Sequence, residues 1–271
     1  MSKSISILGS TGSIGLSTLE LLSKKKFSFK INILSANKNY SLICKQILKF
    51  KPKVFIVDDY FVYLKIKKKF KKKDIKIINK INDKKNIFSK SDITVSAIQG
   101  IAGLIPTIEL IKRSKKILIA NKESIICGWN LIQKIAKKYN TKIIPVDSEH
   151  FSIMKLLENK KTTNIKKIYL TASGGPFLNY KIDKLKKATP KEAIKHPNWN
   201  MGKRISINSA TLMNKMLELI EAKKLFSIDL KKIEIVIHPE SLVHAIVEFK
   251  NGLHEFIYHE TTMLIPLANA I

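Results

Sequence analysis

The sequence predicts an α/β fold, with a doubly wound parallel sheet in the first half and an α+β domain with a mostly antiparallel sheet after it. The first observation is that short apolar runs alternate with helical patterns from residue 4 to residue 139, which is typical of parallel strands joined by helices. The second is that apolar and polar residues alternate within the runs at 233–237 and 243–249, as in sheet strands with one solvated face. Asn251-Gly252 then forms a typical hairpin turn into residues 253–258.

Length and composition are those of a folded protein with two domains. The chain has 271 residues, of which 45% are hydrophobic, enough for two cores of ordinary size. We expect a first domain of residues 1–150 and a second of residues 151–271. No apolar run approaches the ~20 residues of a membrane helix, and the N-terminus enters a strand without a signal peptide. Cys44 and Cys127 are the only cysteines, so a reducing cytoplasm is the simplest location.

The formal net charge of +29 comes almost entirely from lysine. Arg113 and Arg204 are the only arginines, whereas proteins that read nucleic acids depend on arginine for bidentate contacts. The lysine-rich run at 65–73 contains few aromatic residues and is best explained as a solvated helix face. We therefore expect no nucleic-acid partner and no membrane, although the positive field would favour a small anionic substrate.

A glycine-rich turn joins the first predicted strand to the first predicted helix. Residues 4–8 form the strand, Gly9-Ser-Thr-Gly-Ser-Ile-Gly15 the turn, and residues 16–22 the helix. This order is the context in which such a motif binds the pyrophosphate of a dinucleotide, because glycines allow close approach and the helix N-terminus offers N–H groups. The motif indicates a Rossmann-like domain; an ordinary tight turn is the alternative.

The end of the second strand indicates which dinucleotide is bound. An NAD enzyme usually has an acidic residue there that holds the ribose 2′-hydroxyl, but this chain has Asn37, Lys38 and Asn39. A cation and two amides suit a 2′-phosphate, so we infer NADP(H). The alternative is that Lys38 is one more surface lysine.

Five segments fall at the carboxyl ends of predicted strands, which is where doubly wound sheets bind ligands. These segments are residues 9–15, 37–39, 99–103, 121–123 and 147–149. Their coincidence indicates a binding edge more strongly than any one of them does.

The last of these segments contains two carboxylates. Asp147 and Glu149 follow an apolar run that begins at Thr141, and on an extended backbone alternate residues point the same way. Two converging hard oxygen ligands without a nearby cysteine suit Mg²⁺ or Mn²⁺. A solvated strand end with acidic residues is the alternative.

Two loops of the second half have the composition of substrate-binding segments. Ser173-Gly174-Gly175 follows a predicted strand at 166–170, and such a loop presents N–H groups and a hydroxyl to an anion; a plain Gly-Pro turn is the alternative. His196-Pro-Asn-Trp199 lies between helix-breaking residues and is expected to form a lid over substrate, unless the tryptophan is buried for structural reasons.

A helix capped near Asn208 or Ser209 and running to Glu221 is predicted next. Its apolar face would consist of Leu212, Met213, Met216, Leu219 and Ile220. Asn214 and Glu218 are four residues apart and lie with Lys215 on one exposed stripe. Glu218 could complete the carboxylate pair as a third metal ligand, whereas Glu221 is expected to pair with Lys224 at the surface. A simple solvated stripe remains the alternative.

Six segments, in chain order, resemble the 1-deoxy-D-xylulose 5-phosphate reductoisomerase family. They are Gly9-Ser-Thr-Gly-Ser-Ile-Gly15, Ala120-Asn-Lys-Glu-Ser124, Pro145-Val-Asp-Ser-Glu-His150, Ser173-Gly-Gly-Pro-Phe177, His196-Pro-Asn-Trp199 and the segment from Ser209 to Glu218. The resemblance covers residues 1–252. It implies a homodimeric enzyme that uses NADPH and a divalent cation to convert that substrate into 2-C-methyl-D-erythritol 4-phosphate, for non-mevalonate isoprenoid synthesis.

The resemblance also implies a role for each matching residue. Thr11, Gly12, Ser13 and Ile14 would hold the pyrophosphate region of NADPH. Asn37, Lys38 and Asn39 would hold its 2′-phosphate end, and Asn121, Glu123 and Gly202 would complete the cofactor site. Asp147, Glu149 and Glu218 would bind Mg²⁺ or Mn²⁺. Lys122, Ser148, Ser173, His196, Ser209, Asn214 and Lys215 would bind the substrate and its phosphate, with Trp199 in the lid.

The implied chemistry is a rearrangement followed by a reduction. The metal would polarise the substrate ketone and a neighbouring hydroxyl, carbon–carbon cleavage and rejoining would give a branched aldehyde, and NADPH would reduce it. Glu149 and Glu218 would contact the substrate as well as the metal. Lys122 would assist proton movement or orient the diol.

Three departures from the family leave an alternative open. Asn37 stands where the family usually has glycine, and residues 259–266 follow only loosely an acidic, arginine-containing segment. The family also continues into a linker and a C-terminal helical domain beyond the point that corresponds to Ile271. A truncated, inactive relic that retains at most NADPH binding is therefore the alternative. A semialdehyde dehydrogenase would need a catalytic cysteine, whereas Cys127 lies within a predicted helix.

Overall fold

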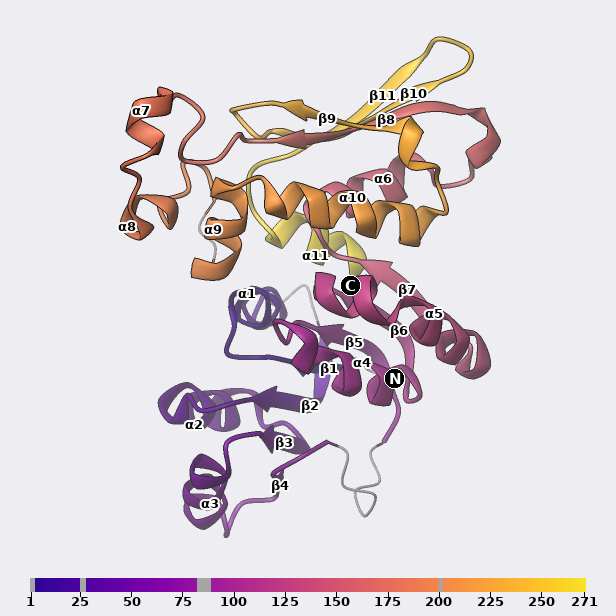
Figure 1. The fold of residues 1–271 in the computed structure, drawn as a ribbon. Coiled ribbons are helices and arrows are strands. Elements are labelled where there is room, and N and C mark those ends of the chain that lie inside the picture. The colour runs from indigo at the N-terminus through magenta and orange to yellow at the C-terminus, as the bar shows by residue number, and fades with distance from the viewer. Residues whose placement is uncertain (1–2, 25–27, 82–88, 200–201) are drawn as a thin grey trace. The chain divides into compact units, whose positions relative to one another are not determined.

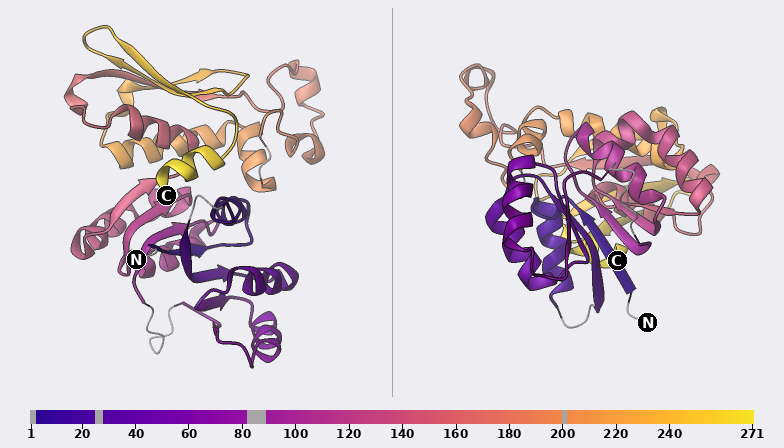
Figure 2. Two further views of the ribbon diagram at one scale, coloured as in Figure 1. Left: turned by 180° about the vertical axis from the view of Figure 1, so that it is seen from behind. Right: turned by 90° about the horizontal axis from the view of Figure 1, so that it is seen from below.

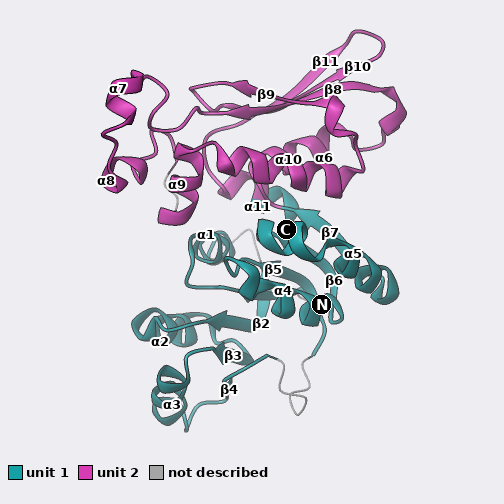
Figure 3. Ribbon diagram, in the orientation of Figure 1, with its two compact units in different colours: residues 1–145, 267–271 teal, residues 146–266 magenta. Residues whose placement is uncertain are grey.

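The computed structural model describes residues 3–24, 28–81, 89–199 and 202–271. It divides into two compact units, of which unit 1 comprises Met1–Pro145 with Leu267–Ile271 and unit 2 comprises Val146–Pro266 (Figure 3). The division therefore falls between Pro145 and Val146, five residues before the expected boundary, and the last residues of the chain return to unit 1. In the described residues, no helix is both long and apolar enough to cross a membrane.

Unit 1 is built on a seven-stranded sheet in the order β4-β3-β2-β1-β5-β6-β7 (Figure 1). Every pair of neighbouring strands is parallel, which confirms the predicted doubly wound sheet. The strands are β1 (Lys3–Leu8), β2 (Phe29–Ala36), β3 (Val54–Val57), β4 (Lys76–Ile78), β5 (Ser91–Ser96), β6 (Ser114–Ile119) and β7 (Lys142–Pro145). The helices are α1 (Ser13–Leu22), α2 (Tyr40–Phe50), α3 (Tyr60–Lys69), α4 (Leu104–Ile111) and α5 (Lys122–Tyr139), with a 3-10 turn η1 (Ile101–Gly103).

The strand order reverses between β1 and β5. Right-handed crossovers then place the helices that follow β1 and those that follow β5 on opposite faces of the sheet, and Figure 2 shows helices on both sides of it. This double covering explains why the inner strands are continuous apolar runs: every residue of β3 is buried, for example. The crevice beside the reversal, beyond the carboxyl ends of β1 and β5, is the ligand site of such sheets.

Unit 2 is built on a four-stranded sheet in the order β11-β10-β8-β9. Strand β10 is antiparallel to both of its neighbours, and β8 and β9 are parallel, so the sheet is mostly antiparallel as predicted. The strands are β8 (Ile165–Ala172), β9 (Ile233–Ile237), β10 (Val243–Phe249) and β11 (His254–Tyr258). The helices are α6 (Ser148–Leu156), α7 (Ile182–Leu185), α8 (Pro190–Ala193), α9 (Lys203–Ala210) and α10 (Met213–Phe226), with 3-10 turns η2 (Thr162–Asn164) and η3 (Leu230–Lys232). A last helix, α11 (Leu264–Ala270), begins in unit 2 and ends in unit 1.

One hydrophobic core holds unit 2 together. Ile153 and Leu156 from α6 and Ala222 from α10 pack with buried residues of β8 and β10. These two helices therefore lie on the same face of the sheet, and the residues on their opposite sides face away from the core. The predicted hairpin between β10 and β11 is confirmed, and Gly252 takes the positive φ of +85° that the turn requires.

The backbone differs from the prediction around both acidic segments. The expected strand from Thr141 through Glu149 ends at Pro145, and Asp147 is the N-cap residue of α6. Aspartate is a favourable cap because its carboxylate faces the positive end of the helix dipole. The single helix expected from Asn208 or Ser209 to Glu221 is two helices, because Leu212 has a left-handed φ of +56° between α9 and α10.

Candidate active site

The first turn of α6 positions two of the predicted metal ligands. Asp147 precedes the helix, and Glu149 is its second residue. The side chains converge as predicted, but not because they alternate along a strand. The first turn of a helix brings them together instead. The helix N-terminus also stabilises both negative charges.

Helix α10 presents three of its charged side chains inward. Lys215, Glu218 and Glu221 are 5%, 1% and 1% exposed, whereas Met213 and Met216 are about half exposed. The predicted exposed stripe of Asn214, Lys215 and Glu218 and the predicted apolar face are therefore wrong in orientation, although Leu219 does pack against the core. Buried charges are costly unless they are paired. The burial of these three side chains therefore directs attention to the groups that surround them.

Three carboxylates converge where α6 and α10 meet. Asp147, Glu149 and Glu218 each offer one oxygen, and these atoms lie within 4.8 Å of one another. The ammonium Nζ of Lys215 bridges two of them, 2.6 Å from Glu149 Oε1 and 2.5 Å from Glu218 Oε2. Burial by itself lowers the pKa of Lys215, but the adjacent carboxylates outweigh burial and raise that pKa above its ordinary value of 10.5.

The donor set of this cluster fits a hard divalent cation. It consists of carboxylate oxygens, as Mg²⁺ and Mn²⁺ prefer, and the two cysteines of the chain lie elsewhere, in α2 and α5. Two neighbours orient the ligands: the Ser148 hydroxyl donates to Glu149, and the Asn214 amide donates to Glu218. Oriented ligands in a buried setting are the usual arrangement of a metal site.

A histidine and a further glutamate support this cluster, and the sequence analysis missed both. His150 is fully buried, and its Nε2 donates to the Glu218 carbonyl oxygen at 2.9 Å. Its Nδ1 lies 3.2 Å from Asp147 Oδ2 and 3.3 Å from Glu221 Oε2. The expected surface pair of Glu221 with Lys224 is therefore wrong. The available signal was helical spacing, because each of the two residues follows a predicted ligand by three positions.

A second group of predicted residues lies where the loop after β8 approaches the end of α9. Gly175 has a φ of +70°, and a Cβ at this position would lie 2.8 Å from the carbonyl oxygen of Ser209. Only glycine therefore allows the loop that follows β8 to approach the end of α9 so closely. Ser173 lies two residues earlier in the same loop, so the loop brings Ser173 to the region of Ser209.

His196 holds Ser173 in place. The ring Nδ1 of His196 accepts the N–H groups of Asn198 and Trp199, at 3.1 and 3.0 Å, so the ring proton is on Nε2. This Nε2–H donates to Ser173 Oγ at 2.9 Å, and Gly175 N–H donates to the same oxygen. The Ser173 hydroxyl hydrogen can then be donated to an anion. Burial lowers the pKa of His196, which favours this neutral form.

Trp199 ends the described part of its loop. Its ring meets the ring of His244 edge to face, with centroids 5.9 Å apart, and His244 stacks on His259. This contact ties the predicted lid segment to β10. The lid itself stays a prediction.

The glycine-rich turn of unit 1 has the backbone of a phosphate-binding loop. Gly9 has a φ of +79°, and a Cβ on Gly15 would collide with the Gly9 carbonyl oxygen. Gly12 is the N-cap of α1, and no side chain among the described residues caps that helix. Its first N–H groups are therefore suited to an anionic ligand. The predicted pyrophosphate contacts, Thr11, Gly12, Ser13 and Ile14, form this turn and the first residues of α1.

The other predicted cofactor residues lie in three places, after β2, after β6 and at the start of α9. Asn37, Lys38 and Asn39 are exposed after β2, and the Asn39 side chain accepts the Leu42 N–H as the cap of α2. Asn121 is buried, and its amide donates to the Gly100 carbonyl while its oxygen accepts from Ser124 N–H. Its side chain therefore supports the loop after β5. The remaining three mark helix starts: Lys122 and Glu123 begin α5, and Gly202 is the N-cap of α9.

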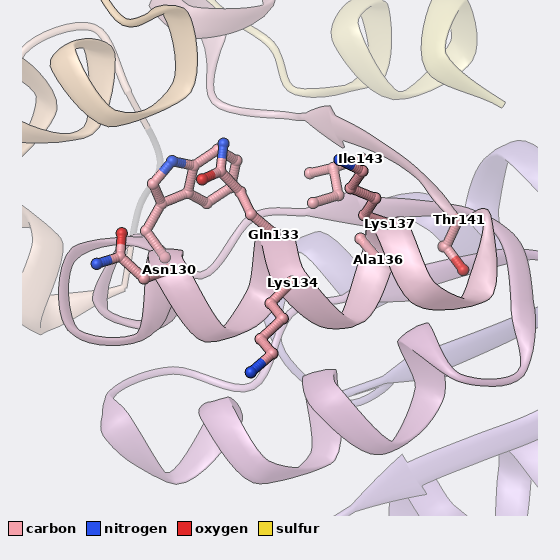
Figure 4. Close-up of a pocket in the computed structure, with 8 residues that line it drawn as sticks. Asn130, Gln133, Lys134, Ala136, Lys137, Thr141 and Ile143 are labelled. Carbon is pink, nitrogen blue, oxygen red and sulfur yellow. The ribbon is translucent and has the colours of Figure 1, made fainter.

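A hollow elsewhere in unit 1 takes no part in these groups. It has a volume of about 540 Å³ and is lined by Trp129, Asn130, Gln133, Lys134, Ala136, Lys137, Thr141 and Ile143. Figure 4 shows Gln133 and Ile143 on one side of α5, with Lys134 extending from the other. None of these residues belongs to the predicted site.

Sequence models of protein families match most of the chain. A model described as 1-deoxy-D-xylulose 5-phosphate reductoisomerase matches residues 5–128, and a model of the C-terminal domain of the same enzyme matches residues 143–226. A curated protein named 1-deoxy-D-xylulose 5-phosphate reductoisomerase, from Pelagibacter ubique, is 52% identical over 272 residues. That alignment covers 99% of this chain and 70% of the relative.

Solved structures of the same enzyme share this fold. One, of DOX-P reductoisomerase in complex with NADPH, fosmidomycin and magnesium, superposes with a TM-score of 0.89 at 36% identity and covers 99% of this chain and 69% of that one. Another, the 1-deoxy-D-xylulose 5-phosphate reductoisomerase from Zymomonas mobilis in complex with NADPH, has a TM-score of 0.88 at 32% identity and covers 100% and 70%.

Proposed function

This chain belongs to the 1-deoxy-D-xylulose 5-phosphate reductoisomerase family, and we propose that it converts this substrate into 2-C-methyl-D-erythritol 4-phosphate. It is an NADP-dependent oxidoreductase of the non-mevalonate isoprenoid route, with NADPH and Mg²⁺ or Mn²⁺ as cofactors. The observation that carries the proposal is the convergence of Asp147 and Glu149 on the buried Glu218. Lys215 pairs with two of these carboxylates, and the set of three oxygen ligands suits a divalent cation.

Each cofactor supplies one part of the chemistry. A divalent cation at the three carboxylates supplies Lewis-acid polarisation of the ketone and hydroxyl oxygens of the substrate. NADPH at the glycine-rich turn supplies the hydride for the final reduction. The residues of the chain supply binding, orientation and exclusion of water around these groups.

The polar residues of unit 2 divide the binding of substrate between two groups. Ser148 and Asn214 orient carboxylates through hydrogen bonds, and Lys215 balances the charge of the cluster. Ser173, held by His196, and Ser209 provide the phosphate end of the site. Phosphate binding remote from the reacting carbons supplies energy that closes Trp199 over the substrate. Lys122, at the start of α5, orients the diol or moves a proton.

An assay of NADPH oxidation tests the proposal. The purified chain is given deoxyxylulose phosphate and Mn²⁺, and turnover is expected only when substrate and metal are both present. Omission of either one is the control. A folded, soluble chain that binds NADPH but shows no turnover would support the inactive relic; among the described residues no observation favours that alternative at present.

Two further parts of the proposal concern the setting of the enzyme. We expect a homodimer, which sedimentation of the purified chain would show as twice the mass of 30.8 kDa. We expect a cytoplasmic location, in keeping with the two free cysteines.

A further inference from the structure

We propose that Gln46 is a positioning residue for the pyrophosphate of the cofactor, an inference that rests on the proposed function. Gln46 lies on α2, and it is not part of the glycine-rich motif. It is 4% exposed although its side chain is polar, and Ser10, its partner in the glycine-rich turn, is fully buried. A buried amide is stable only when its hydrogen bonds are made, so its partners show what it holds.

Gln46 and Ser10 form a closed pair of hydrogen bonds. The Ser10 hydroxyl donates to Gln46 Oε1 at 2.6 Å, and Gln46 Nε2 donates to the Ser10 carbonyl oxygen at 2.8 Å. The carbonyl oxygen can only accept, so the amide has a single possible orientation. The side chain thereby fixes both the hydroxyl and the peptide plane of Ser10.

The end of β2 completes this support. Ser10 N–H donates to the Ser35 carbonyl oxygen at 2.8 Å, and Gly9 N–H donates to Ser35 Oγ at 3.0 Å. Every polar group of Ser10 is therefore bound to β2 or α2. Helix α2 is itself anchored by Ile43 and Ile47, which are buried.

These contacts determine where the following N–H groups point. The turn after Ser10 closes with Gly12 N–H on the Gly9 carbonyl oxygen at 3.0 Å, and α1 begins one residue later. A rotation of the Ser10 peptide would turn the N–H groups of Thr11, Gly12 and Ser13 away from a bound phosphate. Gln46 therefore acts on the cofactor through Ser10, without contact with it.

Gln46→Met tests this role, because methionine has a similar length and makes neither hydrogen bond. NADPH binding is measured by fluorescence, and we expect the dissociation constant to rise about tenfold, as the loss of two buried hydrogen bonds implies. The turnover number at saturating NADPH should stay unchanged. Binding of adenosine 2′-monophosphate, which lacks the pyrophosphate, should also stay unchanged.

Two comparisons keep the test decisive. Gln133→Met makes the same exchange at an exposed position of α5 and should bind NADPH as the wild type does. Ser10→Ala is the milder variant. The double variant should have the same dissociation constant for NADPH as Gln46→Met alone, because both residues act through the same pair of hydrogen bonds. Unchanged NADPH binding by Gln46→Met, or an equal loss for both ligands with a lowered melting temperature, would overturn the inference. Wild-type protein that does not bind NADPH would contradict the proposed function instead.

Discussion

The glycine-rich turn of unit 1 and the carboxylate cluster of unit 2 are both proposed sites for charged ligands, but they offer different chemical groups. The turn offers backbone N–H groups, and the residues that shape it, Gly9, Gly12 and Gly15, are adjacent in the chain. The cluster offers side-chain oxygens from Asp147 and Glu149 on α6 and from Glu218 on α10, about seventy residues later. The anion site is local in the chain, whereas the cation site exists only when two helices pack together.

This difference shows in the way that each site is supported. Neutral hydrogen bonds that Gly9 and Ser10 donate to Ser35 and Gln46 hold the turn. Charges hold the cluster, because the ammonium of Lys215 lies between two carboxylates. Backbone N–H groups are neutral, so neutral hydrogen bonds are enough to hold them in place. Carboxylates that are removed from water need a cation beside them. The two sites should therefore respond to different substitutions, and the following experiments test that separation.

The largest effect is expected for Glu218→Gln. It keeps the shape of the side chain and removes one negative ligand, so metal-dependent turnover should fall roughly a thousandfold, in the range measured for loss of one electrostatic catalytic group. NADPH binding should be nearly unchanged. Activity titrated with Mn²⁺ and NADPH fluorescence measure the two quantities, and Glu158→Gln on the surface is the matched control. Equal loss of both would show that the two sites are not separate.

Lys215→Met should reduce stability when no metal is bound. The variant leaves the carboxylates of Glu149 and Glu218 close together without their ammonium, at a cost of about 3 kcal/mol. Unfolding in urea gives this free energy, and Mg²⁺ should recover more stability in the variant than in the wild type. Lys223→Met, on the exposed side of α10, should have no comparable effect. A variant as stable as the wild type without metal would mean that the carboxylates are not compensated by Lys215.

Lys38→Glu tests the anion site in the opposite direction. A negative charge after β2 should repel the 2′-phosphate, so NADPH binding should weaken roughly tenfold while NADH binding changes little. Competition titrations measure both constants, and Lys45→Glu on the exposed side of α2 is the control. An unchanged preference for NADPH would remove Lys38 from the 2′-phosphate site, and metal affinity should not change in either case.

The smallest effect concerns the pH response of His196. Burial depresses its pKa below the ordinary value of 6.5 in the folded chain, so the stabilising neutral ring is fully present above pH 6.5 and is lost as the pH falls through the folded pKa. Protonation would also end acceptance by Nδ1 of the Asn198 and Trp199 N–H groups. An NMR titration should place the midpoint of His196 below 6.5. A midpoint at or above 6.5 would contradict the buried, neutral ring.

The sequence by itself determined the strand–helix order of unit 1, the hairpin of unit 2 and three of the carboxylates that converge. Hydrophobic periodicity and glycine spacing are local properties, and the fold of unit 1 is a sum of local units. The carboxylates were also predicted: helical spacing offered Glu218 as a third ligand beside Asp147 and Glu149, and the resemblance to a family supported this set. Spacing along the chain left a solvated acidic pair equally open.

Only the tertiary structure decided which side of α10 faces inward. The pattern predicts that Met213 and Met216 are buried and that Lys215, Glu218 and Glu221 are solvated, and the structure shows the reverse. The reason is that α6 brings Glu149 against this helix, where the Lys215 ammonium lies between the Glu149 and Glu218 carboxylates and compensates for their loss of water. No single segment contains that information, because the Lys215 ammonium is shared between the Glu218 carboxylate on its own helix and the Glu149 carboxylate on α6.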